Sequence, residues 1–123
     1  MTDASFTKRE RIRIHADFKT IYKKGGRQTT EHFFIITCPN ELGWRRLGVT
    51  VSKSIGTAVK RNYVKRRLRE YFRLNKAQFP ASSDMLIVAK PGASELKYHA
   101  LREELNRIFL PQTDNKDNKT ASP

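Results

Sequence analysis

Three stretches of the chain place apolar residues every three or four positions, which is the period of an amphipathic helix. The first stretch carries Ile14, Phe18, Ile21 and Tyr22. The second carries Val64, Leu68, Tyr71 and Phe72, and the third carries Tyr98, Leu101, Leu105, Ile108 and Phe109. We therefore predict helices over residues 15–24, 57–78 and 94–110.

Residues typical of helix ends flank these stretches. Gly25-Gly26 is expected to end the first helix, because glycine adopts the left-handed backbone conformation without steric cost. Thr57 suits the N-cap of the second helix, since its hydroxyl can accept a hydrogen bond from a first-turn amide. Pro80 and Pro111 follow the second and third helices, which cannot continue through a proline.

Three shorter stretches predict β-strands. Residues 33–38 are a continuous aromatic and β-branched run, and Pro39 breaks it. Residues 47–51 alternate between apolar and small or polar side chains, and residues 40–46 look like a hairpin connection between these two strands. Residues 85–89 are a short apolar run and predict a third strand.

The predicted order of helix, strand, strand, helix, strand and helix is typical of an α+β fold. We expect a two-layer α/β sandwich, in which a small mixed sheet carries the helices on one face. The length of 123 residues suits one domain. We expect that domain over residues 1–111, with a basic arm of little fixed structure at residues 1–13, and a disordered polar tail at residues 112–123.

The net charge of +13 changes this picture because its distribution is uneven. Residues 1–76 hold 19 Lys and Arg against 6 Asp and Glu, whereas residues 77–123 hold 6 of each kind. A surface that serves only solubility mixes both signs throughout. The asymmetry indicates a polyanionic partner on one part of the fold; the alternative is a generally basic protein with solvated faces.

The apolar residues and the cysteine exclude other classes of protein. No apolar run approaches the roughly 18 residues that cross a bilayer, and residues 1–7 lack the apolar segment of a signal peptide. The one cysteine, Cys38, can form no internal disulfide and suits a small core residue. We expect a cytoplasmic protein that does not bind a membrane.

The second predicted helix separates apolar from cationic residues most clearly. From Lys60 to Arg73 it has seven basic residues and one acid, Glu70. At about 100° per residue, the side opposite the apolar stripe carries Asn62, Lys65, Arg66, Arg69 and Arg73. Arginine can hold two phosphate oxygens at once, and the amino end of a helix favours an anion. This side is predicted to bind a polyphosphate backbone; the alternative, an ordinary solvated face, would pair more acids with its bases.

Two aromatic residues lie one turn apart on the first predicted helix. Phe18 and Tyr22 could stack on the bases of a single-stranded nucleic acid, at about 1–3 kcal/mol per base. Aromatic residues at this spacing are also ordinary core residues, and the sequence alone favours that alternative. Phe33 and Phe34 are neighbours in a predicted strand, so they must face opposite sides of the sheet.

The sequence offers little for catalysis. His15, His32 and His99 are scattered, without the spacing of zinc ligands, and no phosphate-binding loop or nucleophile elbow is present. Acids of the last third, such as Asp84 and Glu104, are expected to balance local Lys and Arg. We predict no catalytic residue, no metal site on the protein and no small-molecule substrate.

Residues 48–70, which read GVTVSKSIGTAVKRNYVKRRLRE, resemble the bacterial ribonuclease P protein family. Residues 17–22 resemble the first helix of that family, and residues 87–93 and 101–105 resemble its last strand and last helix. The resemblance covers roughly residues 8–110, and its central block is long and specific.

The resemblance implies both a fold and an activity. The fold would be a small α/β sandwich related to the second domain of ribosomal protein S5, with a left-handed βαβ crossover around the basic helix, although general rules favour right-handed crossovers. The protein would be an accessory subunit of an endoribonuclease whose catalytic RNA, with Mg²⁺, removes the 5′ leader of precursor tRNA. It would bind both RNAs and broaden the range of substrates.

The resemblance also implies two groups of site residues. The catalytic RNA would be bound by Lys60, Arg61, Asn62, Lys65, Arg66, Arg69 and Arg73. The leader of precursor tRNA would be bound by Phe18, Tyr22, Ser52 and Lys53. The family motif is often Arg-Asn-Arg, and Tyr63 holds its third place in this chain. A ring there could stack on a base, and Arg67 beside the motif could supply part of the charge.

Two other functions fit the same sequence. A structural RNA-binding protein, for example of the ribosome, would carry the same cations without taking part in cleavage. A basic amphipathic helix could instead lie on an anionic membrane. The apolar stripe of this helix is short and consists of Val64, Leu68 and Phe72, so packing on the sheet can bury all of it. No apolar side would then remain for a membrane, which makes membrane binding the weaker alternative.

Overall fold

The computed structural model describes residues 7–12 and 15–109. Four strands form one mixed sheet: β1 (Gly26–Thr29), β2 (Phe33–Pro39), β3 (Arg46–Thr50) and β4 (Ser83–Ala89). Their order across the sheet is β1-β2-β4-β3, with β4 antiparallel to β2 and parallel to β3. The three predicted strands are therefore confirmed, and β1 is an addition to them.

Three α-helices accompany the sheet: α1 (His15–Lys24), α2 (Ala58–Asn75) and α3 (Tyr98–Phe109). Four short 3₁₀ helices join them: η1 (Lys8–Glu10), η2 (Lys53–Ile55), η3 (Lys76–Gln78) and η4 (Ala93–Glu95). The third α-helix begins four residues later than Ser94, because residues 93–95 form the separate helix η4. The expected α+β fold with a small mixed sheet is confirmed.

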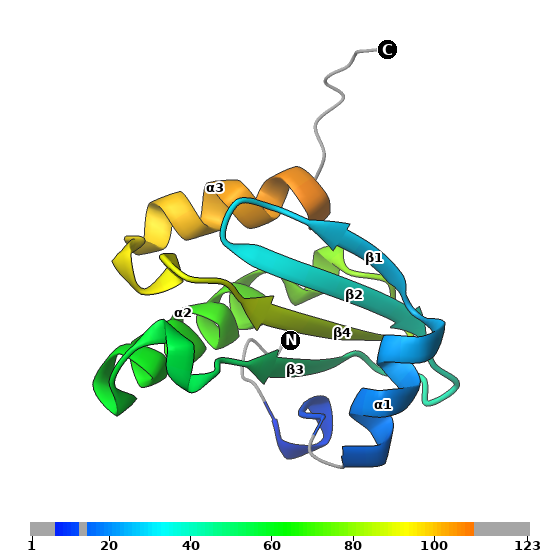
Figure 1. The fold of residues 1–123 in the computed structure, drawn as a ribbon. Coiled ribbons are helices and arrows are strands. Elements are labelled where there is room, and N and C mark those ends of the chain that lie inside the picture. Colours follow the sequence, from blue (N-terminus) through cyan, green and yellow to red (C-terminus); the bar gives the residue numbers. More distant parts are fainter. Residues whose placement is uncertain (1–6, 13–14, 110–123) are drawn as a thin grey trace.

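The two faces of the sheet have separate apolar clusters. The cluster under α2 and α3 includes Phe33, Ile35, Leu47, Val64, Leu68, Ile87 and Leu101. The cluster under α1 consists of Ile12, Ile21, Ile36, Cys38 and Leu86. Figure 1 shows α1 apart from α2 and α3 in the same way. The expectation of helices on one face holds for α2 and α3 but not for α1, because alternate residues of β2 and β4 are apolar on both faces.

The connection between β2 and β3 is not a hairpin, so that expectation was wrong. β4 lies between the two strands and pairs with both of them. β4 is buried along nearly its whole length, and a strand covered on both faces belongs inside a sheet. The chain therefore passes from β3 through α2 to the parallel strand β4. The left-handed sense of this crossover and the relation to ribosomal protein S5 stay predictions.

Strand β1, at the edge of the sheet, has no apolar pattern in the sequence that would predict it. Its four residues are polar or glycine and all are exposed, so they show no apolar alternation. β1 pairs antiparallel with β2, from Gly26 opposite Thr37 to Thr29 opposite Phe34. A short polar strand at an edge also discourages pairing with other chains.

Residues 7–12 are packed on the domain, which differs from the expected loose arm. The Ile12 amide donates to the Leu47 carbonyl of β3 at 3.0 Å, and the Ile12 side chain is buried. Lys76 Nζ lies 2.7 Å from Glu10 Oε2, and the Glu10 carboxylate also accepts from the Thr7 amide and hydroxyl. Residues 1–6, 13–14 and the predicted tail at residues 112–123 lie outside the described residues.

Candidate RNA interface

Helix α2 begins at a capped amino end and is held on the sheet by one apolar stripe. The Thr57 hydroxyl accepts a hydrogen bond from the Lys60 amide at 3.3 Å, as the N-cap prediction requires. The buried residues of the helix are Val64, Leu68, Tyr71 and Phe72. Because this stripe fixes the rotation of α2, the opposite side points away from the core.

We call this opposite side the cationic face and define it by Asn62, Lys65, Arg66, Arg69 and Arg73. Asn62 and Arg66 are exposed, and the others are half-buried. Within the described part of the chain, Lys65, Arg66 and Arg69 form no ion pair with a carboxylate. These three side chains therefore keep their charge available for a polyanion, and the predicted separation of the two sides of α2 is confirmed.

Arg73 differs from the other cations because a carboxylate already holds it. Arg73 Nη2 lies 2.6 Å from Glu70 Oε2, and Arg73 Nε donates to Glu70 Oε1 at 3.1 Å. This pair lowers the pKa of Glu70 and raises the pKa of Arg73. Arg73 brings less net charge to the cationic face than its position suggests.

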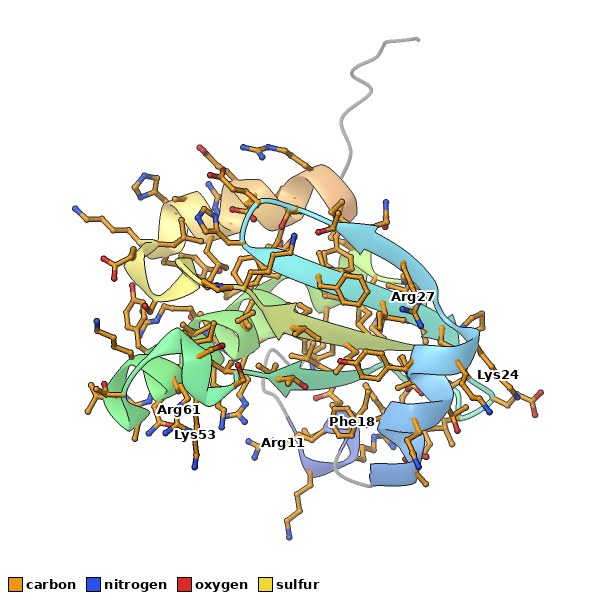
Figure 2. All side chains as sticks on the ribbon, viewed as in Figure 1. Arg11, Phe18, Lys24, Arg27, Lys53 and Arg61 are labelled. Carbon is orange, nitrogen blue, oxygen red and sulfur yellow. The ribbon has the colours of Figure 1, made fainter. Side chains whose placement is uncertain are left out.

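The amino end of α2 collects further cations. Lys60 is exposed, and Arg61 Nε donates to the Gly56 carbonyl at 3.2 Å. Lys53 is exposed on η2, and Figure 2 shows it at the same end of the molecule as Arg61. The neighbouring Ser52 is also exposed, with its hydroxyl 2.7 Å from the hydroxyl of Ser54. The helix dipole adds to the attraction for an anion at this end.

Arg11 joins the cationic face from outside α2, and sequence reasoning missed it. A hollow of about 610 Å³ over the outer side of α2 is lined by Arg11, Arg66, Arg67, Arg69, Glu70, Arg73 and Tyr98. Burial lowers the pKa of Arg69, and the nearby charge of Arg11 lowers it further. The signal that could have placed Arg11 is the apolar Ile12 beside it, which anchors the segment on β3.

Phe18 and Tyr22 take an intermediate position between core and surface. Both are half-buried and pack on the cluster under α1. The ring of Phe18 lies directly over Gly48 of β3, where a methyl group would come within 2.9 Å of Phe18 Cε1. One side of each ring thus packs on this cluster, and part of each ring remains exposed.

The surface beside these rings is also cationic. The guanidinium of Arg27 lies 5.8 Å from the centroid of the Phe34 ring, on the α1 side of the sheet. In the view of Figure 2, Arg11 lies between Phe18 and Lys53. Phe34 is half-buried here whereas Phe33 is fully buried on the other face, as the alternation predicted. The structure therefore places partly exposed rings and cations on one surface.

Tyr63 does not point outward as a stacking platform, so that expectation needs correction. Its hydroxyl donates to the Leu96 carbonyl at 3.0 Å, which ties α2 to the segment before α3. The guanidinium of Arg67 lies 5.0 Å from the centroid of the Tyr63 ring. The ring is half-buried against the main core, so Tyr63 holds Arg67 in place rather than offering a free face to a base.

Asp84 has an arginine partner, as predicted, whereas Glu104 is bound by Thr30 and His32 rather than by a Lys or Arg. Arg46 binds both carboxylate oxygens of Asp84 at 2.8 Å and reaches Asp17 of α1 at 3.1 Å. Glu104 of α3 accepts from the Thr30 hydroxyl at 2.5 Å and from the His32 amide at 2.6 Å. These carboxylates stabilise the contacts between elements and leave the cationic face unneutralised.

Clusters of metal-binding side chains were sought among the described residues. In residues 7–12 and 15–109, no group of three or more His, Cys, Asp and Glu side chains is arranged to hold a metal. The carboxylate on the outer side of α2, Glu70, is engaged by Arg73. In the same part of the chain, no helix has the length and apolar character needed to cross a membrane.

The fold and the surface together define a small basic α+β protein that presents a cationic helix beside a sheet with partly exposed aromatic rings. The model of the Ribonuclease P family matches residues 6–111. The chain belongs to the ribonuclease P protein family, whose members are protein components of a ribonucleoprotein endoribonuclease that processes tRNA.

Relatives in sequence and in structure agree with this assignment. The ribonuclease P protein component of Syntrophus aciditrophicus is 44% identical over 115 residues, which cover 94% of this chain and 97% of the relative. The structure of the RNase P protein of Staphylococcus aureus matches with a TM-score of 0.77 at 34% identity, covering 86% and 98% of the two chains. The RNase P protein of Thermotoga maritima matches with a TM-score of 0.74 at 33% identity, covering 81% and 94%.

Proposed function

We propose that this protein binds the catalytic RNA of ribonuclease P through α2 and the 5′ leader of precursor tRNA through the α1 side of the sheet. In this proposal the RNA subunit carries out the cleavage, and the protein positions the substrate and broadens its range. The observation that carries the proposal is the cationic face of α2, which lies opposite a fully buried apolar stripe.

The catalytic RNA is assigned to α2 because this helix offers the longest ordered row of cations. Arg66, Arg69 and Arg73 lie three, four and seven residues apart, so their guanidinium groups follow the helix axis. Guanidinium groups can hold two phosphate oxygens each. With Lys60, Arg61, Asn62 and Lys65, these residues form the proposed contact with the catalytic RNA.

The leader is assigned to the α1 side because single-stranded RNA needs bases stacked as well as phosphates neutralised. Phe18 and Tyr22 are half-buried rings in this region, and Lys53 and Ser52 are exposed after β3. One side of each ring is supported by core residues such as Leu86, which holds the ring in place without hiding it.

Magnesium is assigned to the RNA partners rather than to the protein. The carboxylate on the outer side of α2 is held by Arg73, and octahedral Mg²⁺ is commonly bound by one or two carboxylates together with phosphates. We also propose the cytoplasm as the place of action, since the free cysteine Cys38 suits a reducing compartment.

Against the membrane alternative, the apolar stripe of α2 is not accessible to lipid. Val64, Leu68 and Phe72 are each at most 1% exposed, so the stripe that would insert into lipid is part of the core. Structural RNA binding without a role in cleavage is a distinct outcome of the cleavage assay.

The test is cleavage of a precursor tRNA by the catalytic RNA of a bacterial ribonuclease P, at low Mg²⁺, with and without the protein. The proposal predicts faster cleavage with the protein. Binding to the catalytic RNA without faster cleavage would assign the protein a structural role only. Equal rates and no binding would refute both parts of the proposal.

A further inference from the structure

The amino-terminal segment places a further arginine, Arg11, against the cationic face. Arg11 lines the hollow over α2 together with Arg66 and Arg69. The hollow carries five arginines and one glutamate, and that glutamate pairs with Arg73. Like charges at this density are unfavourable in the free protein.

The repulsion between these like charges affects Arg69 most directly. This residue is half-buried, and no carboxylate among the described residues forms an ion pair with it. Burial and the charge of Arg11 both lower its pKa. An anion between the two guanidinium groups would remove the repulsion and compensate the lost hydration.

The position of Arg11 is fixed by neighbours that have no part in binding an anion. Ile12 is buried under α1 and its amide donates to Leu47, while Arg11 itself forms a parallel bridge with Leu47. On the preceding turn, Glu10 is buried and pairs with Lys76. These contacts hold Arg11 beside α2 before any partner arrives.

We propose that Arg11 and Arg69 together hold one backbone phosphate of the catalytic RNA, so that the docked amino-terminal segment completes the interface on α2. This inference rests on the proposed function and deepens it. It adds a contact from a different element, and it makes docking of residues 8–12 part of RNA binding. A hollow of about 610 Å³ leaves room for the ribose on either side of that phosphate.

Arg9 supplies a matched control on the same segment. Its guanidinium lies 4.8 Å from the centroid of the Trp44 ring, and Trp44 Nε1 donates to the Arg9 carbonyl at 2.8 Å. Arg9 is not among the residues that line the hollow over α2. Arg9→Gln and Arg11→Gln therefore remove the same charge, two residues apart, in different surroundings.

The experiment measures the Kd of each variant for a transcript of the catalytic RNA over a range of salt concentrations. For Arg11→Gln we expect weaker binding and a slope of log K against log salt that is smaller by about 0.9, the value for one phosphate. For Arg9→Gln we expect the slope of the unchanged protein. In the double variant Arg11→Gln/Arg69→Gln, the loss should be smaller than the product of the single losses, because both residues hold one phosphate.

Two further measurements distinguish a shared phosphate from a general effect of charge or of stability. Arg11→Lys should keep the wild-type slope but bind more weakly, since lysine has the charge without the planar fork. Without RNA, Arg11→Gln should still unfold in one cooperative thermal transition, so that its weaker binding reports on the interface and not on loss of the fold. Equal slopes for Arg9→Gln and Arg11→Gln would overturn the inference. Failure of the unchanged protein to bind the transcript would instead overturn the proposed function.

Discussion

Gly48 of β3 offers a way to move the ring of Phe18 without changing its chemistry. A methyl group at this position would lie 2.9 Å from Phe18 Cε1 and 3.2 Å from Leu86 Cδ1. Ordinary contacts between carbon atoms are about 3.5–4.0 Å, so Gly48→Ala forces a shift of roughly 0.5–1 Å. Leu86 is fully buried and cannot give way, whereas Phe18 is half-buried and can swing outward.

The expected costs follow from this geometry. Inserting a methyl group into a packed site typically destabilises a protein by about 1–3 kcal/mol, and the freedom of Phe18 to move places Gly48→Ala near the lower end. If Phe18 supports the leader, its displacement should weaken the stacking of one base, which is worth about 1–3 kcal/mol. The preference for precursor over mature tRNA should therefore fall by roughly fivefold or more.

The assay compares the Kd of the reconstituted ribonucleoprotein for precursor and for mature tRNA. Gly26→Ala is the matched control, because its methyl group would meet only the Thr37 carbonyl, at 4.0 Å. Affinity for the catalytic RNA should be unchanged in both variants. Unchanged discrimination in Gly48→Ala, in a protein that is destabilised as expected, would refute the role given to Phe18.

Three further predictions address the cationic face and the stability of the fold. Arg66→Gln should reduce the salt slope of binding to the catalytic RNA by about 0.9, whereas Arg102→Gln on the exposed side of α3 should leave the slope unchanged. Arg46→Ala should lower the free energy of unfolding in urea by about 3 kcal/mol, because it leaves the buried carboxylate of Asp84 with a hydrogen bond from Asn40 but without a counter-charge; a loss under 1 kcal/mol would contradict this. Burial alone would raise the pKa of Glu104, but hydrogen bonds from Thr30 and His32 outweigh it and lower the pKa below 4.5. The stability that Glu104 contributes should thus be complete above pH 4.5 and decline as the pH falls through its folded-state pKa, and Glu104→Gln should flatten that decline in thermal unfolding.

Local sequence signals were sufficient for α2. Thr57 caps the helix, the spacing of Val64 and Leu68 fixes the buried side, and the cations follow on the other side. All of these features lie within one helix and depend on no distant contact. The predicted site on α2 therefore could be derived from periodicity and charge alone.

Features that depend on pairing between distant segments were not predictable in this way. The short polar strand β1 has no pattern of its own and exists because β2 offers it hydrogen bonds. The order of the sheet depends on β4, which lies between β2 and β3 in space. In the sequence, β4 follows both of these strands and is separated from β3 by the whole of α2. Arg11 lines the hollow over α2 because the Ile12 amide bonds to the Leu47 carbonyl, a contact between segments far apart in the sequence.

Tyr63 shows how a single position can mislead. Its place in the sequence motif suggested an outward ring, but the helix rotation turns it toward the segment before α3. The hydroxyl finds the Leu96 carbonyl, and the ring supports Arg67. The cationic side of α2 therefore begins with Asn62 and continues at Lys65 and Arg66, without a contribution from Tyr63.

The most direct measurement of the central claim is site-specific photo-crosslinking in the reconstituted complex. A photo-reactive amino acid in place of Arg66 should crosslink to the catalytic RNA, whereas the same group in place of Arg102 on α3 should give little or no crosslink. The exposed side chains at both positions make the two substitutions comparable. Crosslinks to the catalytic RNA from position 102 but not from position 66 would contradict the assignment of α2 as its binding surface.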